Sequence, residues 1–253
     1  MKKILFILFL LLPFAGIFAQ GEALLPTQGE AATPSLVSEL AVLAGLSLLP
    51  FAVMLLTSYV KIVVVLSLLR NALGVQQSPP NQVLNGIALL MTIYVMFPTA
   101  LAMYNSASTA INSQMPQDLF SGSGAQYIMK VIDAGKEPMR NFLERNSVGQ
   151  HMTSFYNLAY KSFPTEFQAT LKQTDFIVLI PSFITSQLKA AFEIGVLIYL
   201  PFFVIDLVTS NILLAMGMMM LSPLTIALPL KLLLLVMVDG WTLIIQGLVL
   251  TFR

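Results

Sequence analysis

The sequence contains no cysteine and only one histidine, His151. Without cysteine, the chain cannot form disulfides, hold an iron–sulfur cluster or use a thiol in catalysis. A zinc site around one histidine would need carboxylates alone to complete it, so we expect neither a metal nor another cofactor. Charge is also scarce, because Asp, Glu, Lys and Arg make up 10% of the chain against about 25% in soluble domains. The formal net charge of +1 gives no reason to expect nucleic-acid binding.

Apolar residues are abundant instead: 57% of the chain is hydrophobic and the mean hydropathy is +0.84. This composition is typical of a membrane protein or of a subunit in a membrane complex. Residues 1–19 have a basic start, a short apolar run and a small residue at the end, which predicts a signal peptide cleaved after Ala19. An uncleaved signal anchor is the alternative. Residues 20–38, which lack Lys and Arg, are then expected to be a linker outside the cytoplasm.

Residues 39–104 are expected to form a first helical hairpin. Its first apolar segment starts at Leu40 and is interrupted by Lys61, after which we expect the same helix to continue to Leu69. Arg70 and the following Gly and double Pro break the chain, and a second apolar segment runs over residues 83–104. Because Lys61 and Arg70 are the only positive charges of this part, the turn is expected on the cytoplasmic side.

Residues 105–175 differ in composition, because charges of both signs are mixed with apolar residues at helical spacing. This pattern predicts a small helical insert outside the cytoplasm. A loop of this length can be translocated despite its basic residues. We expect His151, which lies in this insert, to be a surface residue.

Residues 176–253 are expected to form a second helical hairpin. Its first helix runs from Phe176 to about Leu214, which exceeds the roughly 30 Å of a lipid core at about 1.5 Å per residue. We therefore expect a kink near Gly195 or Pro201, or a helix that extends beyond the bilayer. The last segment runs over residues 224–250. The predicted fold class is all-α: membrane-associated long helical hairpins with a small helical extracytoplasmic insert.

No catalytic motif is present, since the chain lacks a Gly-rich phosphate loop, a His-Glu-x-x-His and a Gly-x-Ser-x-Gly. Asp206 and Asp239 lie in apolar segments but lack the flanking residues of an intramembrane aspartyl protease. The sequence therefore predicts no enzyme. A proton-coupled small-solute transporter would also place acids here, so that alternative stays open.

Charged residues inside apolar segments need partners, because an unpaired buried charge costs several kcal/mol. Lys189 and Glu193 are four residues apart and can pair on one helix face, while a proton relay or pairing between subunits are the alternatives. The other charges have no partner at that spacing. The residues expected to pair between helices or between subunits are Lys61, Arg70, Lys189, Glu193, Asp206, Lys231 and Asp239.

A methionine-rich run, Ala215 to Pro223, separates the two helices of the second hairpin. Methionine is unbranched and adapts to irregular shapes. One interpretation is core filling at a helix break. The other is a deformable seal around a pore, which requires several copies around one axis.

Several of these stretches resemble the type III secretion export-gate family (SctR/FliP type). The stretches that carry the resemblance are Ser67 to Gln77 with Pro79-Pro80-Asn81, Ala191 to Gly195, Tyr199 to Phe202, Val204 to Val208, Ala215 to Pro223, Leu228-Pro229 with Lys231-Leu232, and Val238 to Trp241. The resemblance covers about residues 40–104 and 176–250. Residues 192–195 and 210–216 favour the injectisome branch (SctR type), whereas the signal peptide is common in the flagellar branch (FliP type), which remains the alternative.

The resemblance implies a pentamer of this chain that assembles with two smaller export-gate membrane proteins into a helically arranged gate. Further implied partners are a larger export-gate protein, the basal-body rings and unfolded secretion substrates. The implied location is the bacterial inner membrane at the core of the basal body, largely on the periplasmic side. The implied pore gasket consists of Met216, Met218, Met219 and Met220. A monomeric membrane anchor or assembly scaffold is the rival to this interpretation.

Overall fold

The computed structural model describes residues 36–75, 79–112, 122–218 and 220–252, and within these ranges all regular secondary structure is helical. This confirms the predicted all-α class. The predicted signal peptide, 1–19, and most of the predicted linker, 20–38, lie outside the described residues. The chain divides into two compact units, residues 1–53 and residues 54–253. The second unit holds the helices that concern the function.

The first apolar segment is two helices, so the prediction of one continuous helix was wrong. Helix α2 spans Leu36–Leu56 and helix α3 spans Tyr59–Leu73. Thr57 and Ser58 separate them, and the Thr57 hydroxyl accepts a hydrogen bond from the Tyr59 N–H at 3.4 Å. Short hydroxyl side chains offer the backbone such an alternative to helical hydrogen bonds, which allows a break without Gly or Pro.

Helices α3 and α4 (Asn81–Asn112) form a hairpin whose turn is held by Arg70. The Arg70 guanidinium donates to the Asn81 side-chain carbonyl and to the Pro79 carbonyl oxygen. Ile62 and Leu84 pack together in the core between the two helices. Helix α4 continues to Asn112, past the end predicted at residue 104, so it carries the hairpin into the stretch assigned to the insert.

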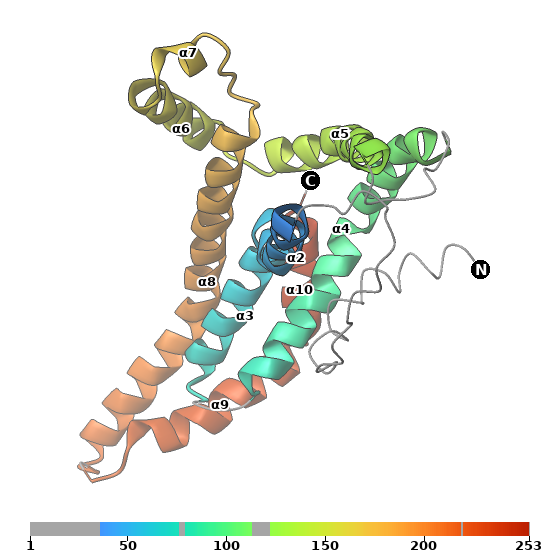
Figure 1. Ribbon diagram of the computed structural model, residues 1–253. Coiled ribbons are helices and arrows are strands. Elements are labelled where there is room, and N and C mark those ends of the chain that lie inside the picture. Colours follow the sequence, from blue (N-terminus) through green and yellow to red (C-terminus); the bar gives the residue numbers. More distant parts are fainter. Residues whose placement is uncertain (1–35, 76–78, 113–121, 219, 253) are drawn as a thin grey trace. The chain divides into compact units, whose positions relative to one another are not determined.

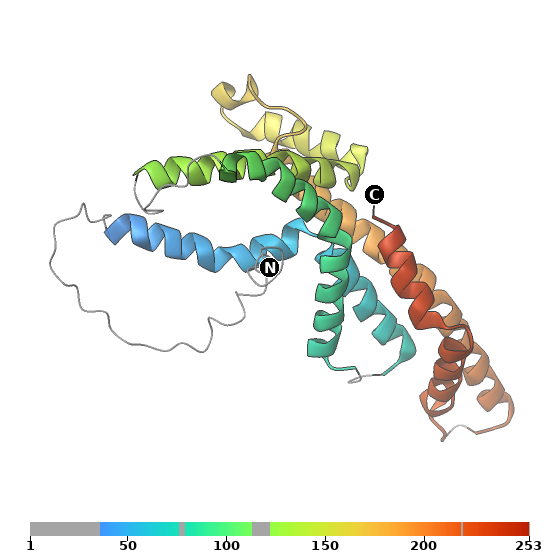
Figure 2. The same ribbon diagram turned by 90° about the vertical axis from the view of Figure 1, so that its right-hand side faces the viewer.

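The insert contains helices α5 (Gly122–Arg145), α6 (Gly149–Ser162) and α7 (Thr165–Gln168). Helix α5 packs against α4, and α6 packs against the start of the next long helix (Figures 1 and 2). His151 is half-buried rather than a surface residue, because its Nδ1 lies 2.8 Å from the Ser186 hydroxyl. That hydroxyl already donates to the Ser182 carbonyl, so His151 Nδ1 acts as the donor.

Helix α8, Phe176–Ala215, is a single helix of 40 residues, or about 60 Å. Neither of the predicted kink sites ends it. It runs beside α3 in the second unit (Figure 1). A Cβ added at Gly195 would lie 2.2 Å from Leu68 Cδ1 on α3, so the two helices approach each other closely only because residue 195 has no side chain.

The last apolar segment is also two helices, α9 (Pro223–Met237) and α10 (Gly240–Leu250), bent by 64°. From the sequence, the segment was expected over residues 224–250, and the bend within it was not predicted. Asp239 at the bend has a φ of 51°, a left-handed conformation that a continuous helix cannot contain. By length and composition, α4 and α8 can each cross a membrane, and the described residues hold up to four spans if each bent pair counts as one.

Candidate functional site

The methionine run forms the turn between α8 and α9, at one end of their hairpin (Figure 1). Two backbone hydrogen bonds close the C-terminal end of helix α8. The Met218 N–H donates to Leu213 O, and the Gly217 N–H donates to Leu214 O, both at 3.0 Å. Gly217 has a φ of 73°. This pattern is a Schellman C-cap, which needs a residue that tolerates a left-handed backbone, and glycine does so without strain. The turn is therefore a defined structure that presents its side chains outward.

The described methionine side chains of this turn are exposed: Met216 by 61%, Met218 by 46% and Met220 by 103%. Met219 lies outside the described residues. Within the single chain these three thioethers fill no core, so the interpretation as core filling is not the one that this geometry favours.

A buried ammonium joins three helices near this hairpin. Lys231 on α9 is 2% exposed, and its Nζ lies 2.7 Å from Asp206 Oδ2 on α8. Lys231 Nζ also donates to the Ala72 carbonyl oxygen at 3.0 Å, in the last turn of α3. Carbonyls at a helix C-terminus lack helical partners and carry partial negative charge. Lys231 therefore satisfies the end of α3 and neutralises a carboxylate at the same time.

Lys189 and Glu193 lie side by side on α8, with Nζ and Oε1 3.8 Å apart. Their side chains are 52% and 64% exposed. Ion pairs exposed to this degree contribute about 0–1 kcal/mol, so this pair does little for the single chain.

Lys61 is buried on α3 but meets no carboxylate within ion-pair distance among the described residues. Its Nζ donates to the Thr251 hydroxyl at 3.1 Å and lies 3.7 Å from the centre of the Phe252 ring. A cation over an aromatic face is stabilised by the ring quadrupole. Lys61 thus fastens the end of the described chain to α3.

The remaining two charges have neutral partners in this structure. Arg70 holds the α3–α4 turn, as described above, and Asp239 accepts a hydrogen bond from the Thr242 hydroxyl at 2.9 Å. Of the seven charged residues singled out in the sequence, the structure joins Asp206 to Lys231 and Lys189 to Glu193.

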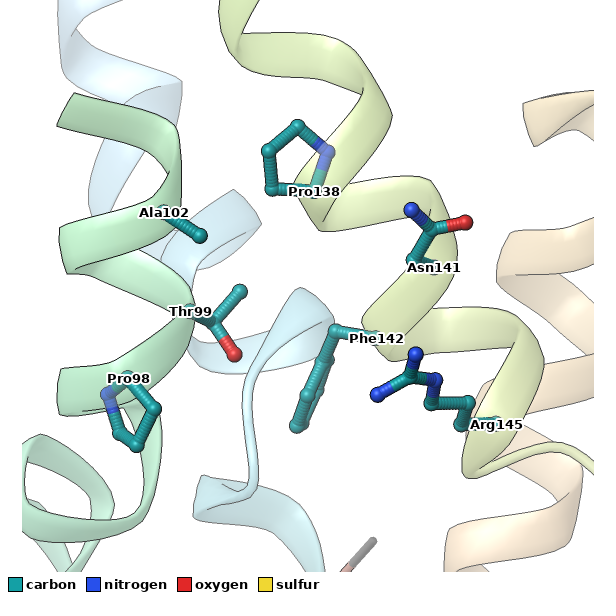
Figure 3. A pocket seen from close by; sticks show the side chains of 7 residues that line it. All are labelled: Pro98, Thr99, Ala102, Pro138, Asn141, Phe142 and Arg145. Atoms are coloured by element: carbon teal, nitrogen blue, oxygen red, sulfur yellow. The ribbon is translucent and has the colours of Figure 1, made fainter. Parts of the chain in front are cut away.

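Sequence reasoning missed the partners of two buried ammonium groups. The partner Ala72 contributes a backbone carbonyl, which no side-chain pattern reveals. Thr251 and Phe252 directly follow the last apolar segment. A hydroxyl and an aromatic ring next to each other there gave only a weak indication that they bind a buried lysine. Sequence reasoning also missed a pocket of about 290 Å³ between α4 and α5, which is lined by Pro98, Thr99, Phe142 and Arg145 among others (Figure 3).

These features define a class: an all-helical protein with membrane-length apolar helices, an exposed methionine turn and buried charges, and without a metal-binding cluster in the described ranges. The chain matches the FliP family over residues 42–248, and it belongs to that family. The sequence resemblance to the export-gate family is therefore confirmed.

Curated relatives cover most of both chains. The hypersensitivity response secretion protein HrcR of Ralstonia nicotianae is 46% identical over 209 residues, which are 83% of this chain and 94% of the relative. The Yop proteins translocation protein R of Yersinia pestis is 44% identical over 219 residues, 87% of this chain and 97% of the relative. The virulence protein YscR of Salmonella typhimurium is 43% identical over 208 residues, 82% of this chain and 92% of the relative. The names of these relatives agree with the injectisome branch.

Proposed function

We propose that this protein is a core, pore-forming subunit of a bacterial type III secretion export apparatus and that it conducts unfolded protein substrates across the inner membrane without enzymatic activity. The observation that carries the proposal is the FliP-family match over residues 42–248, together with relatives named as secretion and translocation proteins. The flagellar export gate, which belongs to the same family, is the alternative.

Assembly into an oligomer, which we propose to be a pentamer, is supported in its first part by the apolar surface that α8 exposes. Contiguous exposed apolar surface marks an interface with protein or lipid. Large apolar side chains are exposed along much of the helix, at Phe192, Val196, Leu197, Leu200, Phe203, Val204, Leu207, Val208 and Ile212. In the proposed assembly, this surface packs against neighbouring copies, two smaller export-gate membrane proteins and a larger one within the basal-body rings.

The proposed location is the inner membrane, with much of the assembly on its periplasmic side. Helix α8 is about 60 Å long, twice the roughly 30 Å of a lipid core, which suits a helix that continues beyond the bilayer. Residues 105–175 are the proposed periplasmic insert between the hairpins 39–104 and 176–253. Residues 1–19 are the proposed signal peptide.

The proposed pore gasket is the methionine turn, with Met216, Met218, Met219 and Met220 contributed by each copy. Thioether side chains pack around irregular shapes and carry no charge. Several such turns around one axis close against one another and give way to varied substrates. The exposure of three of these residues in the single chain supports this role, because they are available to line a shared axis.

The proposed role of the charged residues is to fix how helices and subunits fit together. Within one chain, buried Lys231 pairs with Asp206 and so fixes α9 against α8. Lys61, Arg70 and Asp239 meet no opposite charge within ion-pair distance in the described part of the chain, and they are proposed to find their partners in the assembly. Lys189 and Glu193 are exposed enough to exchange their mutual contact for one across a subunit boundary.

The test replaces Met218, Met219 and Met220 together by Ala, with the triple change to Leu as the control of similar volume. The purified complex keeps its subunit copy number in native mass spectrometry. After reconstitution into vesicles, the Ala complex is expected to leak small ions, whereas the Leu complex stays close to the parent. An Ala complex as tight as the parent contradicts the gasket, and a protein that is only monomeric contradicts the assembly.

A further inference from the structure

The methionine turn closes the α8–α9 hairpin at its tip (Figures 1 and 2). Its described residues from Met216 to Pro223 are all exposed. Side-chain packing within one chain therefore does little to fix the path of the turn. What fixes this path is to be found in the backbone between the last buried residue of α8, Leu213, and the start of α9.

Three backbone features define the path of the turn. The Schellman cap described above ends α8, with Gly217 in the left-handed conformation. Beyond the cap, the Leu221 N–H donates to Met218 O at 3.3 Å. Pro223 is then the first residue of α9, where its fixed φ suits the first helical turn. Few residues separate these two fixed ends, so the turn has little slack.

Gly217 is the residue on which the cap depends. At its φ of 73°, a side chain would bring Cβ close to the following carbonyl oxygen, which for Ala lowers the equilibrium constant of the left-handed turn about tenfold. The surroundings are open, because apart from its neighbours in the chain no described atom lies within 4 Å of a Cβ added there. Gly195 is the opposite case, since it lies within a helix but has no room for a side chain. Glycine is thus needed at position 217 for its backbone and at position 195 for space.

The conformation of Gly217 decides where the following methionines point. Both hydrogen bonds of the cap reach back to α8, from the N–H groups of Gly217 and Met218 to Leu214 O and Leu213 O. Outside the left-handed region these bonds are lost, and the chain leaves α8 in another direction. Met218 and Met220 are then no longer presented along the same path in every copy.

We propose that Gly217 is the positioning residue of the pore seal. Its left-handed backbone gives the turn one fixed path, so the flexible part of the seal is the thioether side chains and not the chain itself. This role rests on the proposed gasket and deepens it. It implies that the seal can be made to leak with every methionine in place.

The experiment compares Gly217→Asn, Gly217→Ala and Gly217→Val in the purified complex. Native mass spectrometry measures the subunit copy number, and ion leak is measured after reconstitution into vesicles. Asparagine adopts the left-handed conformation more readily than most residues with a side chain, so its leak is expected within about twofold of the parent. Alanine is expected to leak about tenfold more than the parent, because leak scales with the population of turns that leave the fixed path. Valine is β-branched and is expected to leak more than alanine.

The order of the series separates backbone strain from size. Asparagine and valine are both larger than alanine, so a lack of room in the assembly would make Gly217→Asn worse than Gly217→Ala, whereas strain predicts the reverse. Gly247→Ala is the matched control, because Gly247 also has open space around it but lies within α10. Alanine is favourable in a helix, so the control is expected to leak no more than the parent.

Three results would overturn the role of Gly217. The first is a Gly217→Ala complex that leaks no more than Gly247→Ala, and the second is a Gly217→Asn complex that leaks more than Gly217→Ala. The third is a Gly217→Ala protein that does not assemble, because Gly217 would then act in assembly and not in sealing. If Gly217→Val alone fails to assemble, the comparison of Asn with Ala decides.

The triple Ala variant of the methionines, measured alongside, distinguishes a failure of this role from a failure of the gasket. A leaky triple variant together with a tight Gly217→Ala complex would leave the gasket standing and remove the role of Gly217. A tight triple variant would contradict the gasket and, with it, the role of Gly217 in placing the methionines.

Discussion

The pair formed by Asp206 and Lys231 predicts an asymmetry between two single substitutions. Lys231 is 2% exposed, whereas the Asp206 side chain is 35% exposed. Asp206→Ala leaves a buried ammonium with the Ala72 carbonyl as its remaining acceptor. Lys231→Met leaves a carboxylate that water can still reach and places an apolar chain in a buried site. The acid is therefore expected to be the costlier residue to remove.

The magnitudes follow from burial. Removing one partner of a buried pair costs about 3–5 kcal/mol, because it leaves an uncompensated buried charge. For Lys231→Met we expect about 1–2 kcal/mol, since one hydrogen bond to a helix end is lost while the carboxylate regains hydration. The double variant, Asp206→Ala with Lys231→Met, has no buried charge and is expected to resemble Lys231→Met alone. The effects of the two substitutions are thus non-additive, and the double variant is more stable than Asp206→Ala.

The assay measures the thermal midpoint of the purified complex in detergent. The complex is heated, and the height of its peak in size-exclusion chromatography is recorded as a function of temperature. For a chain of this size, about 1 kcal/mol corresponds to roughly 2–4 °C, so a difference near 2 kcal/mol separates the two single variants by roughly 4–8 °C. Equal midpoints for the two single variants, or a double variant that is the least stable, would refute the reasoning from burial.

Two further variants test contacts elsewhere on α8 with the same thermal assay. Gly195→Ala brings a methyl group within 2.2 Å of Leu68 Cδ1 and is expected to lower the free energy of unfolding by about 1–3 kcal/mol. Adding Leu68→Ala in the same chain removes the clashing side chain and is expected to recover part of this loss. If the double variant recovers nothing, the clash with Leu68 is not the cause of the loss. Lys189→Gln removes a pair that is more than half exposed on both sides and is expected to change stability by less than about 1 kcal/mol; a larger loss would show that Lys189 has a partner in the assembly.

The helices themselves could be predicted from hydropathy, because long runs without charge leave few other ways to satisfy the backbone. Their breaks could not. Thr57 and Ser58 end a helix without Gly or Pro, and an apolar run hides the bend at Asp239. Only the order Asp239-Gly240 was a usable sign, since an acid before a new helical stretch is typical of an N-cap. Local conformation at one or two residues decided both breaks, and periodicity averages over such short stretches.

The buried charges were identified from sequence, but their partners were not assigned. Asp206 and Lys231 lie almost equally far from the methionine turn, so an antiparallel hairpin brings them level with each other. That register argument was available once the turn was placed. The bond from Lys231 to the Ala72 carbonyl was not available, because it depends on how α3 ends against α9. The pocket between α4 and α5 likewise depends on how these two helices pack, and no motif marks it.

The exposure of the methionine turn also has a chemical consequence. Met220 is fully exposed and Met216 is 61% exposed, so a small oxidant reaches their sulfur atoms without any opening of the fold. Oxidation to the sulfoxide converts a flexible apolar side chain into a polar one and disrupts methionine-rich contacts. The same openness that makes these side chains available to a neighbour also makes them sensitive to peroxide, and repair then depends on a reductase that can reach the turn.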